Sequence, residues 1–377
     1  MQDDRTQSNY QIAVITYIYA DNYGSVLQGY ALVSALKEMG YDAFFIDYKK
    51  KEVIDLYRIF KPLASKYNIL TDCYHLLHYF QLQKKRALFQ EFRNRFLPKS
   101  HYCYETFDSL TGNVPKADCY ICGSDQVWNT GIVDFDSHYL LDFVKDQKKI
   151  SYAASGITPE TPEEDIEAIA GLIHSFSSVS VRETIAKKRL ERACDIEIEC
   201  VVDPVALLSA QEWERIIPDS ATKLPYIFCY FAGGVSKAFD QYTKNLAKML
   251  GLKRILIMPE WRNASRSGTK KYDCGPIEFL SYIRSAALVC TNSFHGTVFS
   301  VIFNRPFIVG LHKPFTEERI RTFLSMCQLE NREIDPQVEA LNERVLDIDF
   351  SVANKMMRDA ADKSKRWLRS AIEGGVL

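Results

Sequence analysis

His295 and Gly296 lie at the junction between two apolar stretches of the sequence. The stretch "ALVCT" before them predicts a buried strand, and "TVFSVIFN" predicts a helix that begins near Thr297. The free N–H groups and the positive dipole end of such a helix favour an anion such as phosphate or carboxylate. An imidazole at this point can donate a proton or bind an anion. The alternative is a histidine whose ring is satisfied by backbone carbonyls within the turn.

Arg182 and Asp125 hold the same kind of position, close behind predicted strands. Arg182 ends "VSVR" just before a predicted helix, where a guanidinium suits bidentate binding of carboxylate or phosphate. The alternative for Arg182 is an ion pair with a nearby acid such as Glu183. Asp125, in "CGSDQVWN", is suited to orienting sugar hydroxyls or to acting as a base, and it could equally cap the following turn.

Two series of alternating strands and helices position these residues. "QIAVITYIYA", "VLQGYALVSALKEMG" and "YDAFFIDY" read as strand, helix and strand, which is a βαβ unit and therefore part of a parallel sheet. After the polar stretch "PDSATKL", a second series begins with "PYIFCYF". We therefore predict the α/β class, with two Rossmann-like lobes at residues 1–220 and 221–349 and a C-terminal helix at 350–377.

The carboxyl ends of the strands are the expected binding edges, because ligands of open α/β sheets bind there. This rule favours residues that come just after a predicted strand. It selects Asn22, Tyr23, Gly24, Gly123, Ser124, Asp125, Arg182, Asp203, Gly233, Gly234, Ser293, Phe294, His295 and Gly296.

Residues 49–99 form a helical insertion in the first predicted lobe and carry twelve Lys and Arg against four acids. One interpretation is a helical segment whose charged face is solvated. The other is a surface that meets anionic lipid headgroups or a diphosphate-linked acceptor. The sequence leaves both open.

Composition and spacing exclude several other functions. The net charge of −1 argues against nucleic acid as a partner. The polar start "MQDDRTQSNY" does not resemble a signal peptide, so we expect a cytoplasmic protein, with the inner face of the membrane as a further location. Cys119 and Cys122 have CxxC spacing, but in a strand they would point to opposite faces, and no metal-ligand spacing appears elsewhere. The absence of GxGxxG argues against NAD.

Several motifs occur in one order along most of the chain: "NYGSVLQGYAL", "CGSDQVWN", "VSVRE", "VVDP", "FLSYIRSAALVCTNSFHG" and "TEERI". Together they resemble the polysaccharide pyruvyl transferase family. The resemblance implies a two-lobed, GT-B-like fold and transfer of a carboxyethylidene group from phosphoenolpyruvate to two hydroxyls of a sugar. It implies that an arginine of the "VR" motif and the histidine of the last motif contact the donor, which are Arg182 and His295 here. The acceptor would be a sugar or a lipid-linked glycan, and no cofactor would be needed.

Ser293 departs from the pattern of the family, because some members carry "RLH" where this chain has Ser293, Phe294 and His295. The arginine two places before the histidine is therefore missing, and another cation must replace it. Candidates near in sequence are Arg262, Arg266, Lys313, Arg319 and Arg321. We prefer Arg319, which lies in "TEERI".

The resulting hypothesis is a pyruvyl transferase that builds a cyclic ketal on a cell-surface polysaccharide or its precursor. His295 would be the general acid or would hold the leaving phosphate, and Asp125 would be the base for the attacking hydroxyl. Two alternatives stay open: a GT-B glycosyltransferase that uses a nucleotide sugar, and a carbohydrate-binding or scaffolding subunit without catalytic activity.

Overall fold

The structure, a computed structural model, describes residues 10–60, 73–132, 135–218, 224–257, 267–311 and 314–374. Two compact units divide the chain. The first comprises Met1–Arg58, Arg93–Leu207 and Ala360–Leu377, and the second comprises Ile59–Phe92 and Leu208–Asp359. Each unit is described separately below.

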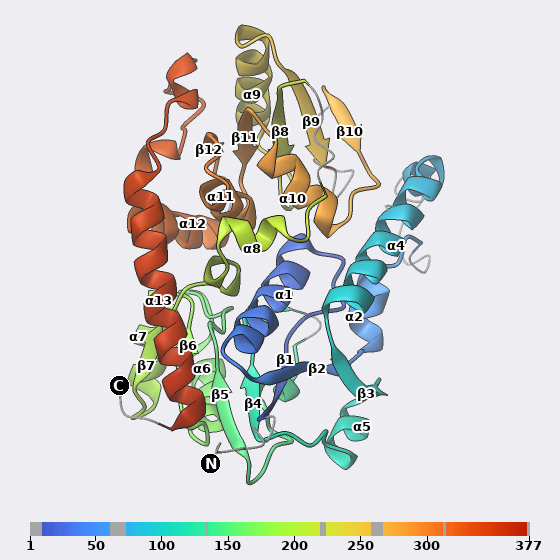
Figure 1. Cartoon of the computed structure of the whole chain (residues 1–377), viewed down its shortest axis with the longest axis vertical. Helices are drawn as coiled ribbons and strands as arrows, with labels where there is room; N and C mark the ends of the chain where they lie inside the picture. Colours follow the sequence, from blue (N-terminus) through green and yellow to red (C-terminus); the bar gives the residue numbers. More distant parts are fainter. Residues whose placement is uncertain are drawn as a thin grey trace, which may run out of the picture. The chain divides into compact units, whose positions relative to one another are not determined.

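The first unit is built on five parallel strands that pair in the order β3-β2-β1-β4-β5 (Figure 1). Two further strands, β6 and β7, pair with each other, and single bridges from Ile150 to Ser178 and from Ala154 to Val181 continue the sheet beyond β5. The strands are β1 (Gln11–Ile15), β2 (Asp42–Tyr48), β3 (Lys99–Tyr104), β4 (Cys119–Cys122), β5 (Lys148–Ser151), β6 (Val179–Val181) and β7 (Ile198–Cys200).

The second unit repeats this arrangement with five parallel strands in the order β10-β9-β8-β11-β12. The order matches that of the first unit strand for strand, since in each case the first strand of the unit occupies the centre. The strands are β8 (Tyr226–Tyr230), β9 (Lys253–Ile257), β10 (Thr269–Lys271), β11 (Leu288–Thr291) and β12 (Phe307–Val309).

Helices follow most strands, as expected for crossover connections between parallel strands. The described helices are α1 (Tyr23–Glu38), α2 (Lys51–Leu56), α4 (Tyr79–Phe96), α5 (Phe107–Gly112), α6 (Glu163–Ile173), α7 (Thr184–Ala193), α8 (Ala210–Glu214), α9 (Lys237–Met249), α10 (Pro276–Arg284), α11 (Phe294–Ile302), α12 (Pro314–Met326) and α13 (Ser351–Glu373). None of these helices combines the length and the apolarity that a bilayer crossing requires.

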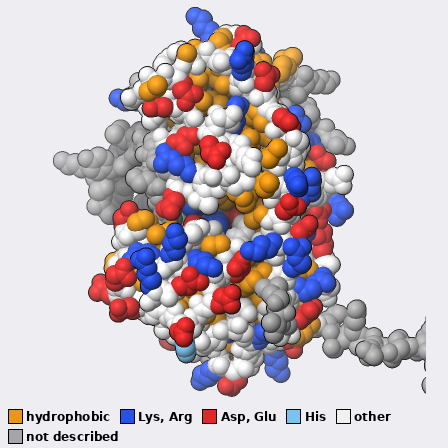
Figure 2. Space-filling view, turned by 90° about the vertical axis from the view of Figure 1, so that its left-hand side faces the viewer, with side chains coloured by type: hydrophobic (Ala, Val, Ile, Leu, Met, Phe, Trp, Pro, Cys, Tyr) orange, Lys and Arg blue, Asp and Glu red, His pale blue; other side chains and the backbone are white. Residues whose placement is uncertain are grey.

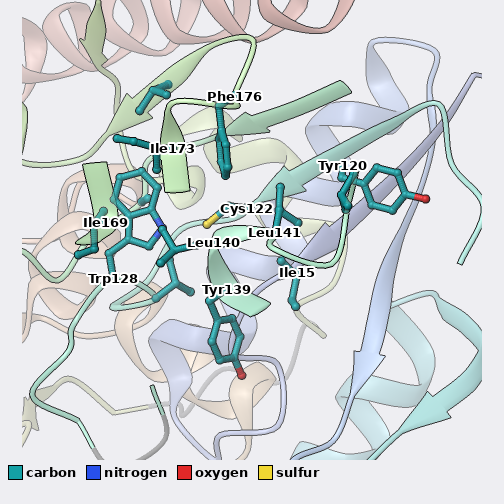
Figure 3. Packing of buried hydrophobic residues seen from close by; sticks show 14 of the residues in the cluster. Ile15, Tyr120, Cys122, Trp128, Tyr139, Leu140, Leu141, Ile169, Ile173 and Phe176 are labelled. Carbon is teal, nitrogen blue, oxygen red and sulfur yellow. The ribbon is translucent and has the colours of Figure 1, made fainter. Parts of the chain in front are cut away.

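The core of the first unit explains why its strands read as apolar runs rather than as alternating patterns. All four residues of β4 are buried, as expected for a strand covered on both faces. Trp128 is fully buried in the same cluster as Leu140, Ile169 and Phe176 (Figure 3). This packing fixes the strand ends that carry the candidate site.

The structure confirms the predicted parallel α/β fold and the C-terminal helix, and it adds two strands that the sequence did not predict. These are β3 and β10, which form the corresponding outer edge of each sheet. Their sequences, "KSHYCY" and "TKK", lack apolar alternation, and most of their residues are exposed or half-buried. An edge strand with one free side can remain polar.

The unit boundaries differ from the predicted lobes in three places. Most of the helical insertion, Ile59–Phe92, groups with the second unit rather than with the first. The second unit begins at Leu208 rather than at residue 221, and the last boundary falls within α13 rather than before it. Contacts to the residues after β10 account for the first difference. The ring of His78 stacks on Tyr272 with 4.0 Å between centroids, and Lys84 Nζ lies 2.9 Å from Asp273 Oδ2.

Candidate active site

In each sheet, the order in which the chain adds its strands reverses direction at one point, beside the central strand. In the first unit this point lies between β1 and β4, and in the second it lies between β8 and β11. Ligands of such sheets bind outside the carboxyl ends of these strands. The loops after the four strands therefore form two candidate binding edges, called the first edge and the second edge below.

At the first edge, Asn22 begins α1 as its N-cap. The side chain of Asn22 accepts a hydrogen bond from the Gly24 N–H at 2.9 Å. Tyr23 is 1% exposed, so its ring belongs to the core rather than to the surface of the edge. Of the three predicted binding residues, Asn22 is therefore the one whose side chain lies exposed at the start of the helix.

Asp125 lies across from α1 in a strained conformation. Its φ of 78° falls in the left-handed region, which aspartate tolerates better than most residues. One carboxylate oxygen accepts from the Gln126 N–H at 2.9 Å, and the other accepts from the hydroxyl of Ser25 in the first turn of α1. The strain costs about 1–3 kcal/mol, and such residues cluster at functional sites. Asp125 is thus hydrogen-bonded to the helix that Asn22 caps.

Arg182, predicted to bind an anion, is compensated by carboxylates of its own unit. Its Nε lies 3.0 Å from Glu183 Oε1 and its Nη1 lies 2.5 Å from Asp203 Oδ2. Its Nη2 donates to Ser155 Oγ at 2.8 Å, and the side chain is 5% exposed. Burial disfavours the charged guanidinium, but Glu183, Asp203 and Asp125 outweigh this and raise the pKa of Arg182. An anion that binds Arg182 must therefore compete with these carboxylates for the charge of the guanidinium.

At the second edge, Asn292 ties the two loops together. Its Oδ1 accepts from the Ala232 N–H at 2.7 Å, and its Nδ2 donates to the Gly234 carbonyl at 2.7 Å. Ser293 then caps α11 by accepting from the Gly296 N–H at 3.4 Å. The loop after β8 and the start of α11 are thereby held in fixed register.

His295 lies in the first turn of α11, because the helix begins at Phe294 and not near Thr297 as the sequence predicted. The imidazole is half-buried, with its Nε2 atom shielded from solvent, and it packs edge-on against the Phe294 ring at 5.3 Å. Gly296 is required by packing, since a Cβ at this position would lie 2.6 Å from Thr291 Oγ1. The residue that closely approaches Gly296 is therefore Thr291, at the end of β11.

Arg319 lies on α12, which packs against α11. Phe323, four residues later on the same face, contacts the Phe294 ring at 6.0 Å. This spacing places Arg319 on the face of α12 that meets the start of α11. Arg321 forms a two-pronged ion pair with Glu333, with Nη2 to Oε1 at 2.6 Å and Nε to Oε2 at 2.9 Å. Arg262, Arg266 and Lys313 lie outside the described residues.

Sequence reasoning missed three residues that organise these edges: Ser25, Ser155 and Asn292. Asn292 directly follows β11, Ser155 lies four residues after β5, and Ser25 lies in the first turn of the helix after β1, and this position behind a strand is the only signal that the sequence offered. Among the residues that the structure describes, no group of three or more His, Cys, Asp or Glu side chains is arranged to hold a metal ion.

Comparison with known proteins agrees with this fold. A model of the family described as polysaccharide pyruvyl transferase matches residues 22–310. No curated protein sequence matches the chain.

Among solved structures, a UDP-N-acetylglucosamine 2-epimerase is 11% identical, with a TM-score of 0.52, 96% of this chain covered and 95% of the other. The Staphylococcus aureus MnaA–UDP co-structure is 10% identical, with a TM-score of 0.50 and coverage of 95% and 91%. A Listeria monocytogenes protein assigned as a UDP-N-acetylglucosamine 2-epimerase is 10% identical, with a TM-score of 0.50 and 98% of both chains covered. At these identities the likeness shows a GT-B-like fold and nothing about the ligand.

Proposed function

Because the chain belongs to the polysaccharide pyruvyl transferase family, we propose that it transfers a carboxyethylidene group from phosphoenolpyruvate to two hydroxyls of a sugar. The product is a cyclic ketal on a cell-surface polysaccharide or its precursor, and the acceptor is a sugar or a lipid-linked glycan. The observation that carries this proposal is the chemistry of the second edge. His295 stands in the first turn of α11, beside loops that contain no acidic residue.

The second edge is suited to the donor. Phosphoenolpyruvate bears a phosphate and a carboxylate, and the first turn of α11 favours an anion through its N–H groups and its dipole. Ser293 and Gly296 form this turn, and His295 supplies the proton. Arg319 is our candidate for the cation that replaces the arginine absent at position 293, because its face of α12 meets the start of α11.

The first edge is suited to the acceptor. Asp125 can accept a proton from a sugar hydroxyl, since a carboxylate offers several acceptor positions beyond the two hydrogen bonds it already makes. Asn22 lies exposed at the same edge, with Tyr23 and Gly24 buried behind it in the first turn of α1. Arg182 is the donor contact that the family resemblance implies.

The proposed reaction proceeds in two additions at one carbon. His295 protonates C3 of the enol ester, which makes C2 electrophilic, and a sugar hydroxyl deprotonated by Asp125 attacks C2. The C2–O bond to phosphate then breaks, inorganic phosphate leaves, and the second hydroxyl closes the ketal at C2. Of the two hydroxyl protons, one balances the proton added to C3 and the other leaves with phosphate. We place this reaction in the cytoplasm.

The test is a donor comparison on the purified full-length chain. With phosphoenolpyruvate and a panel of hexose and lipid-linked acceptors, we expect phosphate release that depends on the acceptor and a product heavier by one carboxyethylidene group. The competing function is glycosyl transfer, which the likeness to nucleotide-sugar enzymes such as the UDP-bound MnaA keeps open. Turnover of UDP-sugars alone would replace the pyruvyl transferase proposal.

A further inference from the structure

The helical segment before and at the start of α4 exposes an unusual amount of apolar surface. Leu76, Leu77 and Phe80 are 69%, 81% and 86% exposed. Phe80 and Leu77 are the two most exposed large apolar side chains among the described residues. We call Leu76, Leu77 and Phe80 the apolar tip. Single exposed apolar residues are ordinary, whereas three within one helical turn require an explanation.

The residues of the apolar tip lie on a hydrogen-bonded helix. Residues 73–77 are helical, and the hydrogen bonds from His78 N to Tyr74 O at 3.2 Å and from Leu82 N to His78 O at 2.9 Å continue the helix into α4. At 100° per residue, positions 76, 77 and 80 lie on one side of this helix. The opposite side is anchored by His78 and Tyr74, whose rings contact Tyr272 at 4.0 and 5.9 Å.

Positive charge surrounds the apolar tip. Lys84, Lys85 and Arg86 follow Phe80 within two turns. Lys84 is paired with Asp273, so Lys85 and Arg86 carry the charge of this flank that Asp273 does not compensate. The face shown in Figure 2 is different, because acidic and basic side chains are interspersed on it. Among the described residues of the segment that carries the apolar tip, 73–92, there are three cations and one acid, Glu91.

We propose that the apolar tip and its basic flank bind the surface of an anionic lipid bilayer. A helix that carries bulky apolar residues and nearby Lys and Arg side chains binds membranes in this way: the apolar residues enter the headgroup boundary and the cations meet lipid phosphates. The charge complementarity selects a bilayer over an apolar protein partner, because such a partner would not need the basic flank. The inference stands independently of the proposed reaction.

The first experiment is flotation of the full-length protein with vesicles at low salt. We expect the protein to float with vesicles of equal parts phosphatidylcholine and phosphatidylglycerol, and to stay behind with phosphatidylcholine alone. Leu77→Ser/Phe80→Ser should lower the vesicle-bound fraction by about tenfold or more, since it removes apolar contact and no charge. The matched control is Val338→Ser, because Val338 is 80% exposed in the same unit but lies outside the basic segment.

Three outcomes would overturn the proposal. They are no flotation of the wild-type protein at low salt, equal flotation with uncharged vesicles, and undiminished flotation of the double variant. The last outcome would mean that charge alone holds the protein on the vesicle. A wild-type dimer that Leu77→Ser/Phe80→Ser dissociates, without any flotation, would also overturn it in favour of a second copy of this chain as the partner.

A labelling experiment locates the contact. Cys73 is exposed three residues before Leu76, and Cys103 is exposed on the first unit. A polarity-sensitive dye on Cys73 in Cys103→Ser should brighten and shift to the blue with anionic vesicles, whereas the same dye on Cys103 in Cys73→Ser should not. Equal responses at both positions, or a response at Cys103 alone, would contradict docking through the apolar tip.

Discussion

The first and second edges are built by the same strand order, but their side chains differ in charge. Beside the first edge, after β6 and β7, the carboxylates of Glu183 and Asp203 pair with the guanidinium of Arg182, and the charge of Asp125 adds to their effect. At the second edge, the stretches "FAGGVS" and "NSFHG" contain no acid, and His295 and a helix start are present. The comparison teaches that topology locates both edges, whereas side-chain charge distinguishes them: carboxylates gather at and beside the first edge, and the second edge offers a histidine and a helix start.

The largest expected effect is on turnover, and it tests whether both edges take part. His295→Ala and Asp125→Asn should each lower phosphate release from phosphoenolpyruvate by about 10²–10⁴, the usual contribution of general acid–base catalysis. Far-ultraviolet circular dichroism checks that both variants are folded. His174→Ala, at the exposed end of α6, serves as the control with normal turnover. Near-normal turnover of either site variant would remove that edge from the reaction.

The next effect concerns the compensated charge at the first edge. Arg182→Met leaves Glu183 and Asp203 buried without their cation, which should lower the free energy of unfolding by about 3–5 kcal/mol. Arg321→Met, which breaks the exposed pair with Glu333, should cost at most about 1 kcal/mol. Urea titration followed by tryptophan fluorescence measures both. If both substitutions lower the free energy of unfolding by the same small amount, Arg182 does not stabilise the fold through these carboxylates. Direct donor binding then becomes its principal role.

A smaller effect is expected from the packing of the second edge. The Cβ that Gly296→Ala adds would lie 2.6 Å from Thr291 Oγ1, so the start of α11 must shift at a cost of about 1–3 kcal/mol. Gly171→Ala in α6 meets nothing within 4 Å and should be neutral or stabilising by up to about 1 kcal/mol. Thermal unfolding of the two variants separates these outcomes, and an unchanged Gly296→Ala protein would contradict the packing described here.

The smallest effect is a pH dependence in the first unit, from two residues that the proposed reaction does not use. Burial of His138 disfavours its charged form, but hydrogen bonds to Asp142 at 2.5 Å and to the Phe107 carbonyl outweigh this and raise its pKa above 6.5. Burial of Asp142 opposes its ionisation, but the bonds from His138 and Ser137 lower its pKa below 3.8.

The directions of these two pKa shifts determine how the stability of the protein changes with pH. The His138 contribution to stability is complete below its ordinary pKa and is lost as the pH rises through its raised value. The Asp142 contribution is lost as the pH falls through its lowered value. Urea midpoints measured across the pH range should therefore decline at both ends, and His138→Gln should remove the decline at high pH. A wild-type decline that survives in His138→Gln would assign it to other groups.

Much of the fold could be predicted from the sequence, because central parallel strands such as β4 and β11 are buried on both faces and read as apolar runs. The edge strands β3 and β10 could not, because their residues are polar and their pairing is decided by the neighbouring strand. The start of α11 was predicted three residues late, since the cap made by Ser293 depends on a turn that the apolar pattern does not show.

The candidate site was predictable in its location but not in its charge balance. The rule that ligands bind after parallel strands found Asp125, Arg182 and His295. It could not show that Glu183 and Asp203, from different strand ends, both reach the guanidinium of Arg182. Such compensation depends on side-chain contacts between residues 21 positions apart, which one sequence does not reveal.

Calorimetric titration of phosphoenolpyruvate into the folded wild-type, His295→Ala and Asp125→Asn proteins tests the division of roles most directly. The account predicts that His295→Ala weakens binding by about tenfold or more, the loss expected when one charge-assisted hydrogen bond to an anion is removed. It also predicts that Asp125→Asn binds the donor as tightly as the wild type or more tightly. Weakened binding in Asp125→Asn together with unchanged binding in His295→Ala would contradict it.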